Sequence, residues 1–151
     1  MPFALRIAVT NAWVSQLFDQ EMAKKGVAPF QAGVLMMVRL LEPVTPTGLE
    51  NEIGLAGTTL RDRIRELTKA GLLERIPNPE DRRSYFLQTT PAASDVLRTA
   101  LATSRRLARL LEKQGAGPLD SLSAALDDVR VAANGLIEGD LESGGRTTGP
   151  W

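Results

Sequence analysis

The segment Gly54–Thr90, GLAGTTLRDRIRELTKAGLLERIPNPEDRRSYFLQTT, decides the fold of this chain because it joins a helix pattern to a hairpin pattern. Its first apolar residues recur at spacings of four and three, which places them on one face of a helix: Leu60, Ile64 and Leu67. Thr59 and Asp62 stand three residues apart and resemble a capping box at the start of that helix. Gly71 suits the left-handed residue that ends a helix. The pattern therefore predicts a helix that begins at Thr58.

The polar side of this predicted helix carries four cations: Arg61, Arg63, Arg65 and Lys69. Asp62 and Glu66 interrupt the positive charge, and each stands three residues from a cation with which it can pair. A solvated helix face with local ion pairs explains these charges without any binding partner. Charge alone therefore favours a solvated face over a binding surface, and the segments that follow the helix have to decide between them.

Two strand patterns follow the helix, Leu72–Ile76 and Ser84–Gln88, and the second has aromatic residues at its centre. Between them lies Pro77–Arg83, a loop that combines two prolines with two acids and two arginines. Helix, strand, charged loop and strand are the order of a winged helix-turn-helix. In that fold the helix enters a major groove of DNA, and the loop, called the wing, reaches the flanking backbone or minor groove.

A shorter helix is predicted just before the first one. Thr47 and Glu50 form a capping-box sequence, with Thr47 as the N-cap, and predict a helix Gly48–Ile53 that Gly54 ends. Residues 55–57 then form the turn, and the two helices share a small apolar core: Leu49, Ile53, Leu55, Leu60 and Ile64. A generic helical hairpin is the alternative, and the wing that follows makes it the weaker one.

The wing sequence resembles that of the MarR family of bacterial transcriptional regulators. The family's wing commonly reads D-P-x-D-x-R. Here Asn78 stands in place of the first Asp, and the other positions match: Pro79, Asp81 and Arg83. The family's helix often ends K/R-G-L, and Ala70 replaces the cation here, before Gly71 and Leu72. The resemblance is specific at the wing and architectural elsewhere.

The end of the hairpin and the extent of the chain add to this resemblance. Leu87–Thr90 is similar to the family's L-x-L-T, with Thr89 in place of the second Leu. The similarity spans residues 3–137. It implies a mainly α fold with a small β-hairpin wing, that is, a winged helix-turn-helix with N- and C-terminal dimerisation helices.

The resemblance also implies which residues contact double-stranded DNA. The exposed N-terminal part of the helix holds Thr58, Thr59, Arg61, Asp62 and Arg63, and Arg65 lies further along it. Arg61 and Arg63 are the candidates for base or phosphate contacts, while the two threonines cap the helix or bind phosphate. In the wing, Arg83 would enter the minor groove with Asp81 bracing it, and Arg82 would touch phosphate. Solvated loop arginines are the alternative for the wing.

The flanking segments predict helices that a small winged-helix core cannot cover alone. They are expected at Phe3–Lys25, Pro29–Leu41, from Thr90-Pro91 to Gln114, and from Leu119 to near Gly139. The third is predicted to start with the Thr90 hydroxyl as its cap and Pro91 at its first position. The second is apolar nearly all round, which predicts burial. The resemblance implies a homodimer through the terminal helices. The expected organisation is 1–28 (N-terminal dimerisation helix), 29–90 (DNA-binding lobe), 91–138 (C-terminal dimerisation helices) and 139–151 (flexible tail).

Relatives of this kind usually release DNA when a small aromatic or anionic effector occupies a cleft between the dimer helices and the DNA-binding lobe. The bulky or cationic residues expected near that cleft are Trp13, Leu17, Phe30, Met37 and Arg39. Core packing explains the apolar members equally well. Pairing with an acid, or extension to the surface, explains Arg39.

Composition excludes several function classes. The 151 residues contain no cysteine and no histidine, which removes thiol sensing, the usual metal ligands and the usual general base. We therefore expect no metal, no cofactor and no enzymatic activity. No apolar run is long enough to span a membrane and no secretory h-region opens the chain, so a cytoplasmic location is expected.

These patterns lead to one hypothesis and one rival. The hypothesis is a homodimeric, sequence-specific DNA-binding transcriptional regulator, in the first instance a repressor, on a pseudo-palindromic operator. The rival is a winged-helix protein-interaction module without DNA binding. The zero formal net charge and the acids Asp62 and Glu66 keep the rival open.

Overall fold

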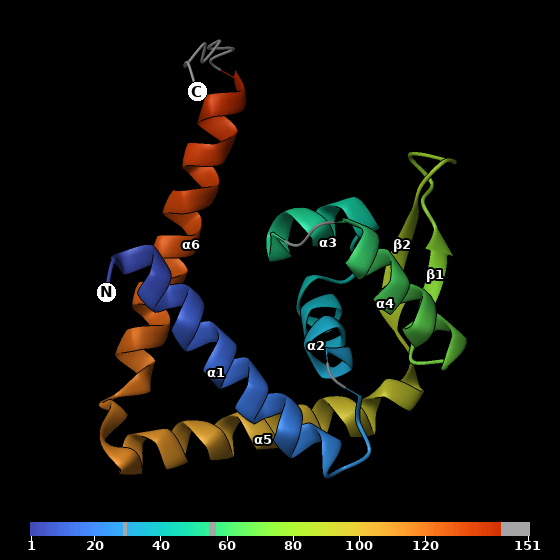
Figure 1. The fold of residues 1–151 in the computed structure, drawn as a ribbon. Helices are drawn as coiled ribbons and strands as arrows, with labels where there is room; N and C mark the ends of the chain where they lie inside the picture. Colours follow the sequence, from blue (N-terminus) through green and yellow to red (C-terminus); the bar gives the residue numbers. More distant parts are fainter. Residues whose placement is uncertain (29, 55–56, 143–151) are drawn as a thin grey trace. The chain divides into compact units, whose positions relative to one another are not determined.

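The computed structural model describes residues 1–28, 30–54 and 57–142, with the backbone alone for residues 138–142. The chain forms two compact units, Met1–Leu107 and Ala108–Trp151. The first unit contains, in order, α1 (Phe3–Ala23), α2 (Gln31–Leu41), α3 (Pro46–Ile53), α4 (Gly57–Lys69), β1 (Leu73–Pro77), β2 (Tyr85–Thr89), a 3-10 turn η1 (Pro91–Ala93) and most of α5 (Ser94–Leu111) (Figure 1). The second holds the end of α5, a π-helical turn η2 (Glu112–Ala116) and α6 (Leu119–Glu142). This order confirms the predicted fold, mainly α with one β-hairpin.

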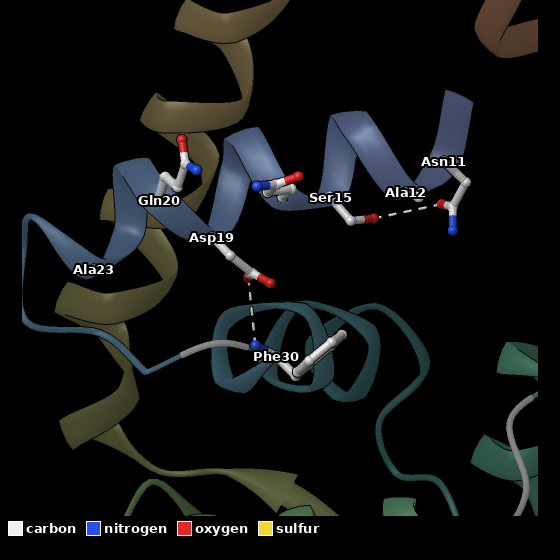
Figure 2. Close-up of a pocket in the computed structure, with 8 residues that line it drawn as sticks. Asn11, Ala12, Ser15, Asp19, Gln20, Ala23 and Phe30 are labelled. Carbon is white, nitrogen blue, oxygen red and sulfur yellow. Dashed lines mark hydrogen bonds between the residues drawn. The ribbon is translucent and has the colours of Figure 1, made fainter. Parts of the chain in front are cut away.

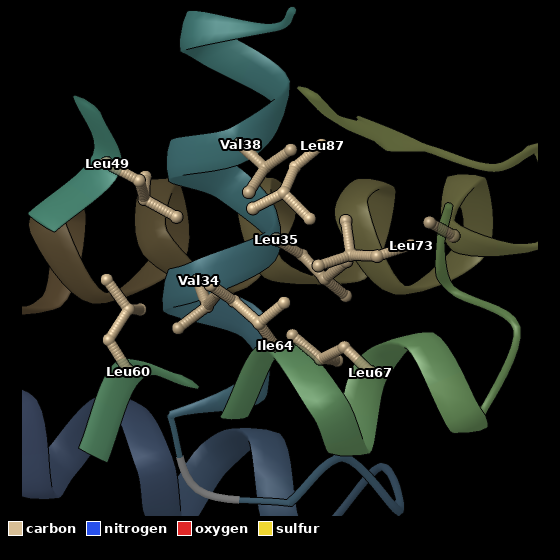
Figure 3. Close-up of a cluster of buried hydrophobic side chains, with 10 residues drawn as sticks. Val34, Leu35, Val38, Leu49, Leu60, Ile64, Leu67, Leu73 and Leu87 are labelled. Atoms are coloured by element: carbon tan, nitrogen blue, oxygen red, sulfur yellow. The ribbon is translucent and has the colours of Figure 1, made fainter. Parts of the chain in front are cut away.

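The main core of the first unit lies where α2, α3, α4 and the hairpin meet. Figure 3 shows buried side chains from these elements pointing toward one another: Val34, Leu35, Val38, Leu49, Leu60, Ile64, Leu67, Leu73 and Leu87. The three apolar residues predicted for one face of α4 are all buried, at 1% exposure or less. Because this face is fully covered, α4 must turn its charged sides outward. Leu55, expected in the same core, lies outside the described residues.

The hairpin pairs β1 with β2 in antiparallel register, from Leu73 opposite Thr89 to Pro77 opposite Tyr85. Each strand begins one residue later than the sequence suggested. The loop before α3 also contacts the hairpin, which the sequence did not predict. Val44 exchanges two backbone hydrogen bonds with Leu87, at 3.4 and 2.8 Å, so that the loop before α3 is anchored to the hairpin.

The start of α3 corrects the predicted cap. Thr45 is the N-cap, its Oγ1 accepts a hydrogen bond from the Gly48 N–H at 3.0 Å, and Pro46 occupies the first helical position. The prediction of Thr47 as the N-cap was wrong because a proline fits the first turn of a helix, so the helix starts before Thr47. Gly54 ends α3 in the left-handed region, as predicted, with φ 67°.

The start of α4 also differs from the prediction. The helix begins at Gly57, so Thr58 and Thr59 lie inside its first turn and Thr59 is not its N-cap. A Cβ on residue 57 would lie 2.7 Å from Oε1 of Glu50, so glycine lets α4 approach that side chain closely. Residues 55 and 56 of the predicted turn lie outside the described residues. Gly71, with φ 72°, ends this segment as expected.

The start of α5 corrects a further cap. The Thr90 hydroxyl makes no capping hydrogen bond and donates instead to the Gly71 carbonyl at 2.6 Å. The end of β2 is thereby tied to the turn after α4. Pro91 opens the 3-10 turn, and the α-helix proper starts at Ser94.

Several other helix ends differ from the predictions by a few residues. α1 ends at Ala23 rather than Lys25, α5 gives way to the π-helical turn after Leu111 rather than continuing to Gln114, and α6 continues past Gly139 to Glu142. Pro29, the expected start of the second helix, lies outside the described residues, and so does the expected tail from residue 143.

A smaller core joins the end of α1 to α2 and α5. It is formed by Met22, Val27, Ala32 and Ala100. Beside it, the Arg106 guanidinium of α5 lies 2.9 Å from the Glu21 carboxylate of α1. Away from this contact α1 is largely exposed, with Trp13 at 68%. The expected all-round burial of α2 was wrong at Leu40, which is 76% exposed because only one side of the helix faces the core.

Candidate nucleic-acid interface

The outward sides of α4 carry the cations that the sequence singled out. Arg61 and Arg65 are the most exposed of the three arginines, at 71% and 72% of their side chains. Thr58, Thr59 and Asp62 are also exposed along the N-terminal half of the helix. The structure thus brings most of the predicted helix residues to one accessible surface.

Each arginine of α4 is paired with an acid in the free chain. Arg61 Nε lies 3.5 Å from Glu50 Oε1 across the helix-turn-helix, and Arg65 pairs with Asp62 one turn earlier. The sequence suggested this second pair; it suggested Lys69 as the partner of Glu66, whose carboxylate pairs with Arg63. Exposed pairs of this kind hold their partners weakly, by about 1 kcal/mol or less, so the arginines remain available to another anion.

Arg63 occupies a different environment from the other two. Its side chain is only 34% exposed, and its Nη1 lies 2.9 Å from Glu66 Oε2. Its guanidinium carbon lies 5.9 Å from the centre of the Phe30 ring, within the range of a cation–π contact. The sequence did not reveal this contact because Phe30 precedes Arg63 by a long stretch of chain.

The wing presents Arg82 and Arg83 as exposed side chains. Asp81 supports them through the backbone: its Oδ1 accepts a hydrogen bond from the Arg83 N–H at 2.9 Å, and its carbonyl accepts one from Ser84 at 3.0 Å. Asp81 therefore shapes the loop from which the Arg83 side chain extends. Its carboxylate acts here on the backbone of Arg83, whereas the sequence suggested a brace on the side chain.

Asn78 stands where the related sequences commonly have Asp, and it still makes the turn contact. Its Oδ1 accepts a hydrogen bond from the Glu80 N–H at 3.0 Å. An amide oxygen serves this backbone-mimicking turn as well as a carboxylate oxygen does. The replacement therefore leaves the geometry of the wing intact while removing one negative charge from it.

The strands below the wing share a cation–π contact that the sequence did not reveal. The Arg75 guanidinium lies over the Tyr85 ring, 4.6 Å from its centre. Because Tyr85 pairs with Pro77, the two side chains are diagonal neighbours on adjacent strands. Arg75 is therefore a further cation on the hairpin that carries the wing, and the Tyr85 ring holds it in place.

The carboxylate of Glu42 anchors the base of the hairpin. It pairs with Arg39, and its Oε2 accepts hydrogen bonds from the N–H and the hydroxyl of Thr89, at 2.7 and 2.9 Å. Burial by itself would raise the pKa of Glu42. The bonds from Thr89 and the pairing with Arg39 outweigh that effect and hold the pKa below its usual range.

The candidate effector residues fall into two groups. Phe30 and Met37 line a pocket of about 370 Å³ beside α4, together with Gly33, Val34, Ile53, Thr59, Leu60 and Arg63. Phe30 also lines a second pocket of about 490 Å³ against α1 (Figure 2), with Asn11, Ala12, Ser15, Gln16, Asp19, Gln20 and Ala23. Trp13, Leu17 and Arg39 line neither pocket.

Two further features bear on the kind of site. Within residues 1–28, 30–54 and 57–142, no three acidic, histidine or cysteine side chains gather as a metal site would require. None of the helices in the described part of the chain is both long and apolar enough to cross a membrane.

The helix-turn-helix formed by α3 and α4, followed by a hairpin whose tip exposes two arginines, defines a winged helix-turn-helix. Residues 25–84 match the sequence model of the MarR family, which confirms the resemblance seen at the wing. The segment that matches holds α2, α3, α4 and the wing.

Solved structures share the fold well beyond that segment. MarR from E. coli in its apo form is 21% identical, with a TM-score of 0.72 over 85% of this chain and 97% of that chain. The transcriptional regulator BldR from Sulfolobus solfataricus is 21% identical, with a TM-score of 0.71 over 83% and 90% of the two chains. A mutant of MarR from E. coli complexed with operator DNA is 21% identical, with a TM-score of 0.67 over 85% and 94%. No curated protein matches the chain by sequence.

Proposed function

We propose that this chain is a cytoplasmic, sequence-specific DNA-binding transcriptional regulator, acting as a repressor and as a homodimer on a pseudo-palindromic operator. The observation that carries the proposal is the joint exposure of Arg61 and Arg65 on α4 and of Arg82 and Arg83 in the wing of one winged helix-turn-helix. A solved structure of the same fold is a complex with operator DNA, which supports the same role here.

In this proposal α4 is the recognition helix and lies in a major groove. Arg61 contacts a base or phosphate, Arg65 contacts phosphate further along, and Thr58, Thr59 and Asp62 complete the surface. Arg63 adds a base or phosphate contact only when its guanidinium leaves Phe30 and Glu66. An arginine bidentate to guanine would discriminate against other bases by about 1–3 kcal/mol. Arg83 enters the flanking minor groove, Arg82 touches phosphate, and Asp81 supports the wing.

The dimer is proposed from the apolar side chains of the terminal helices. On α6, apolar residues that are exposed in the single chain recur at helical spacing on one face: Leu122, Leu126, Val129 and Leu136. On α1, Phe3, Trp13 and Val14 are exposed as well. Residues 1–28 and 91–138 would then form the subunit interface, 29–90 the DNA-binding lobe, and the residues after α6 the tail.

The resemblance to the MarR family also suggests a small-molecule effector, and the two pockets that Phe30 lines are its proposed sites. The pocket beside α4 is walled mainly by apolar side chains and has one cation, Arg63, in its lining. A small aromatic anion suits such a lining. It would release DNA only if it binds a conformation that mismatches the two half-sites.

The rival function, a protein-interaction module without DNA binding, is favoured by one observation. All three α4 arginines are already paired with acids, namely Glu50, Glu66 and Asp62. If those pairs persisted in every complex, α4 would present a nearly neutral surface. The salt dependence of DNA binding separates the two functions, because phosphate contacts release counterions and an apolar protein interface does not.

The test is selection of genomic DNA fragments by the purified protein, followed by affinity measurements across a salt series. We expect selection of a pseudo-palindrome and an affinity that falls steeply with salt. Arg83→Ala should weaken binding and flatten the slope by about 0.9 per chain. Arg98→Ala is the matched control, since Arg98 is also exposed but lies on α5 in a pair with Asp95. Absence of selection at every salt concentration would refute the proposal.

A further inference from the structure

Phe30 connects the first helix of the chain to α4. Its backbone N–H donates to the Asp19 carboxylate of α1 at 3.4 Å (Figure 2), and its ring lies against the Arg63 guanidinium. It is also the side chain that the two pockets described above have in common. One exposed aromatic residue therefore touches both α1 and the proposed recognition helix.

The backbone of Phe30 adopts a conformation that few side chains tolerate. Its φ is 64° and its ψ −18°, in the left-handed region, and no other non-glycine residue in the described part of the chain has a positive φ. Such a residue persists where its surroundings hold it. Here Asp19 accepts its N–H, and its carbonyl accepts the Val34 N–H at 3.1 Å as the first bond of α2. Because this conformation is costly, we expect the contacts of the Phe30 ring to have a role that retains it.

That role concerns the direction of Arg63. Two residues along a helix turn by about 200°, so Arg63 lies on the opposite side of α4 from both Arg61 and Arg65. On that side the Phe30 ring and the Glu66 carboxylate hold its guanidinium, and its exposure is about half that of the other two. In the free chain Arg63 is thus withheld from the most accessible surface of α4.

We propose that Phe30 is a positioning residue that holds Arg63 against the α2 side of α4, and that Asp19 fixes Phe30 in the conformation that does so. The inference rests on the proposed DNA-binding role of α4. An aromatic face attracts a guanidinium through its quadrupole, and Glu66 neutralises the same charge. Loss of the ring frees Arg63 to reach phosphate, so α1 controls how many cations α4 offers to DNA.

The first measurement is DNA affinity across a salt series, by fluorescence anisotropy, with a labelled duplex that spans two half-sites. Phe30→Leu keeps the apolar volume and the backbone cost but removes the aromatic face. It should bind several-fold more tightly, with a salt slope steeper by about 0.9 per chain. Phe30→Tyr keeps the face and should behave as the natural protein. In the Arg63→Ala background, Phe30→Leu should change neither quantity.

The second measurement needs no DNA. The urea midpoints of Phe30→Leu, Arg63→Ala and the double variant test whether the two side chains interact in solution. We expect non-additive shifts, with Phe30→Leu costing less once Arg63 is gone. Additive shifts would overturn the inference whatever the DNA result, because the contact would then be absent.

The role of Asp19 is tested on the same duplex. Asp19→Ala removes the acceptor for the Phe30 N–H and should bind DNA more tightly, as Phe30→Leu does. Asp19→Asn keeps an acceptor oxygen and should remain close to the natural protein. If Phe30→Leu changed DNA affinity equally with and without Arg63, this inference would be overturned but the proposed DNA-binding function would stand. Non-additive urea midpoints without salt-dependent DNA binding would refute the proposed function, and the DNA role of Phe30 with it.

Discussion

Glu42, at the end of α2, accepts two hydrogen bonds from Thr89, at the end of β2, although 47 residues separate them. One carboxylate oxygen satisfies both the backbone N–H and the hydroxyl of the threonine, while the other faces Arg39. The side chain of Glu42 is only 12% exposed, so these bonds lie where water competes little. This ionised group therefore adds a polar link between the hairpin and α2 to the apolar packing of Leu73 and Leu87.

This arrangement predicts how stability depends on pH. Because the pKa of Glu42 is lowered in the folded chain, its contribution is present above the unfolded pKa, about 4.3, and is lost as pH falls through the folded value. Glu42→Gln should therefore cost roughly 1.5–3 kcal/mol at neutral pH. The difference should shrink steadily below about pH 4. Urea unfolding at several pH values measures it, and a difference that does not change with pH would contradict this account.

The cap of α3 predicts a contrast between two threonines. Thr45→Ala should destabilise the chain by about 1 kcal/mol, since it removes the acceptor for the Gly48 N–H. Thr47→Ala, two residues later on the exposed surface, should change the free energy of unfolding by less than about 0.5 kcal/mol. Thermal unfolding of both variants compares them directly. An equal loss for both would show that the helix begins later than at Pro46.

The contacts of Asp81 predict that its substitution lowers DNA affinity without changing the salt dependence of binding. Asp81→Ala removes the hydrogen bond that shapes the backbone at Arg83, so DNA affinity should fall by up to about tenfold. The salt slope should stay unchanged because no cation is lost. Asp81→Asn keeps the acceptor oxygen and serves as the control. A flatter slope in Asp81→Ala would mean that the Arg83 side chain itself no longer reaches the DNA.

The apolar face of α6 predicts the outcome of two charge substitutions. Leu126→Glu places a carboxylate within that face and should weaken the proposed dimer by roughly 3 kcal/mol or more, at least a hundredfold in Kd. Val131→Glu lies about 180° around the same helix from Leu122 and should leave the dimer intact. Sedimentation velocity distinguishes dimer from monomer. Equal behaviour of the two variants would place the interface elsewhere.

Prediction from the sequence succeeded where all the residues that decide a feature lie within one element. The spacing of Leu60, Ile64 and Leu67 predicted both the helix and its buried face, and all three are in the core. The capping predictions at Thr47, Thr59 and Thr90 were wrong for a common reason. A hydroxyl residue near a helix start has several possible partners, and Pro46, Gly57 and the Gly71 carbonyl decided among them.

The sequence by itself determined the class of fold, the wing and the cations at its surface, because those follow from periodicity, turn residues and spacing within short segments. Only the tertiary structure decided the partners: Thr89 on Glu42, Val44 on Leu87, and Phe30 on Arg63. The physical reason is the distance along the chain. Hydrogen bonds and ring contacts act over a few ångströms, and only packing determines which remote residues come that close.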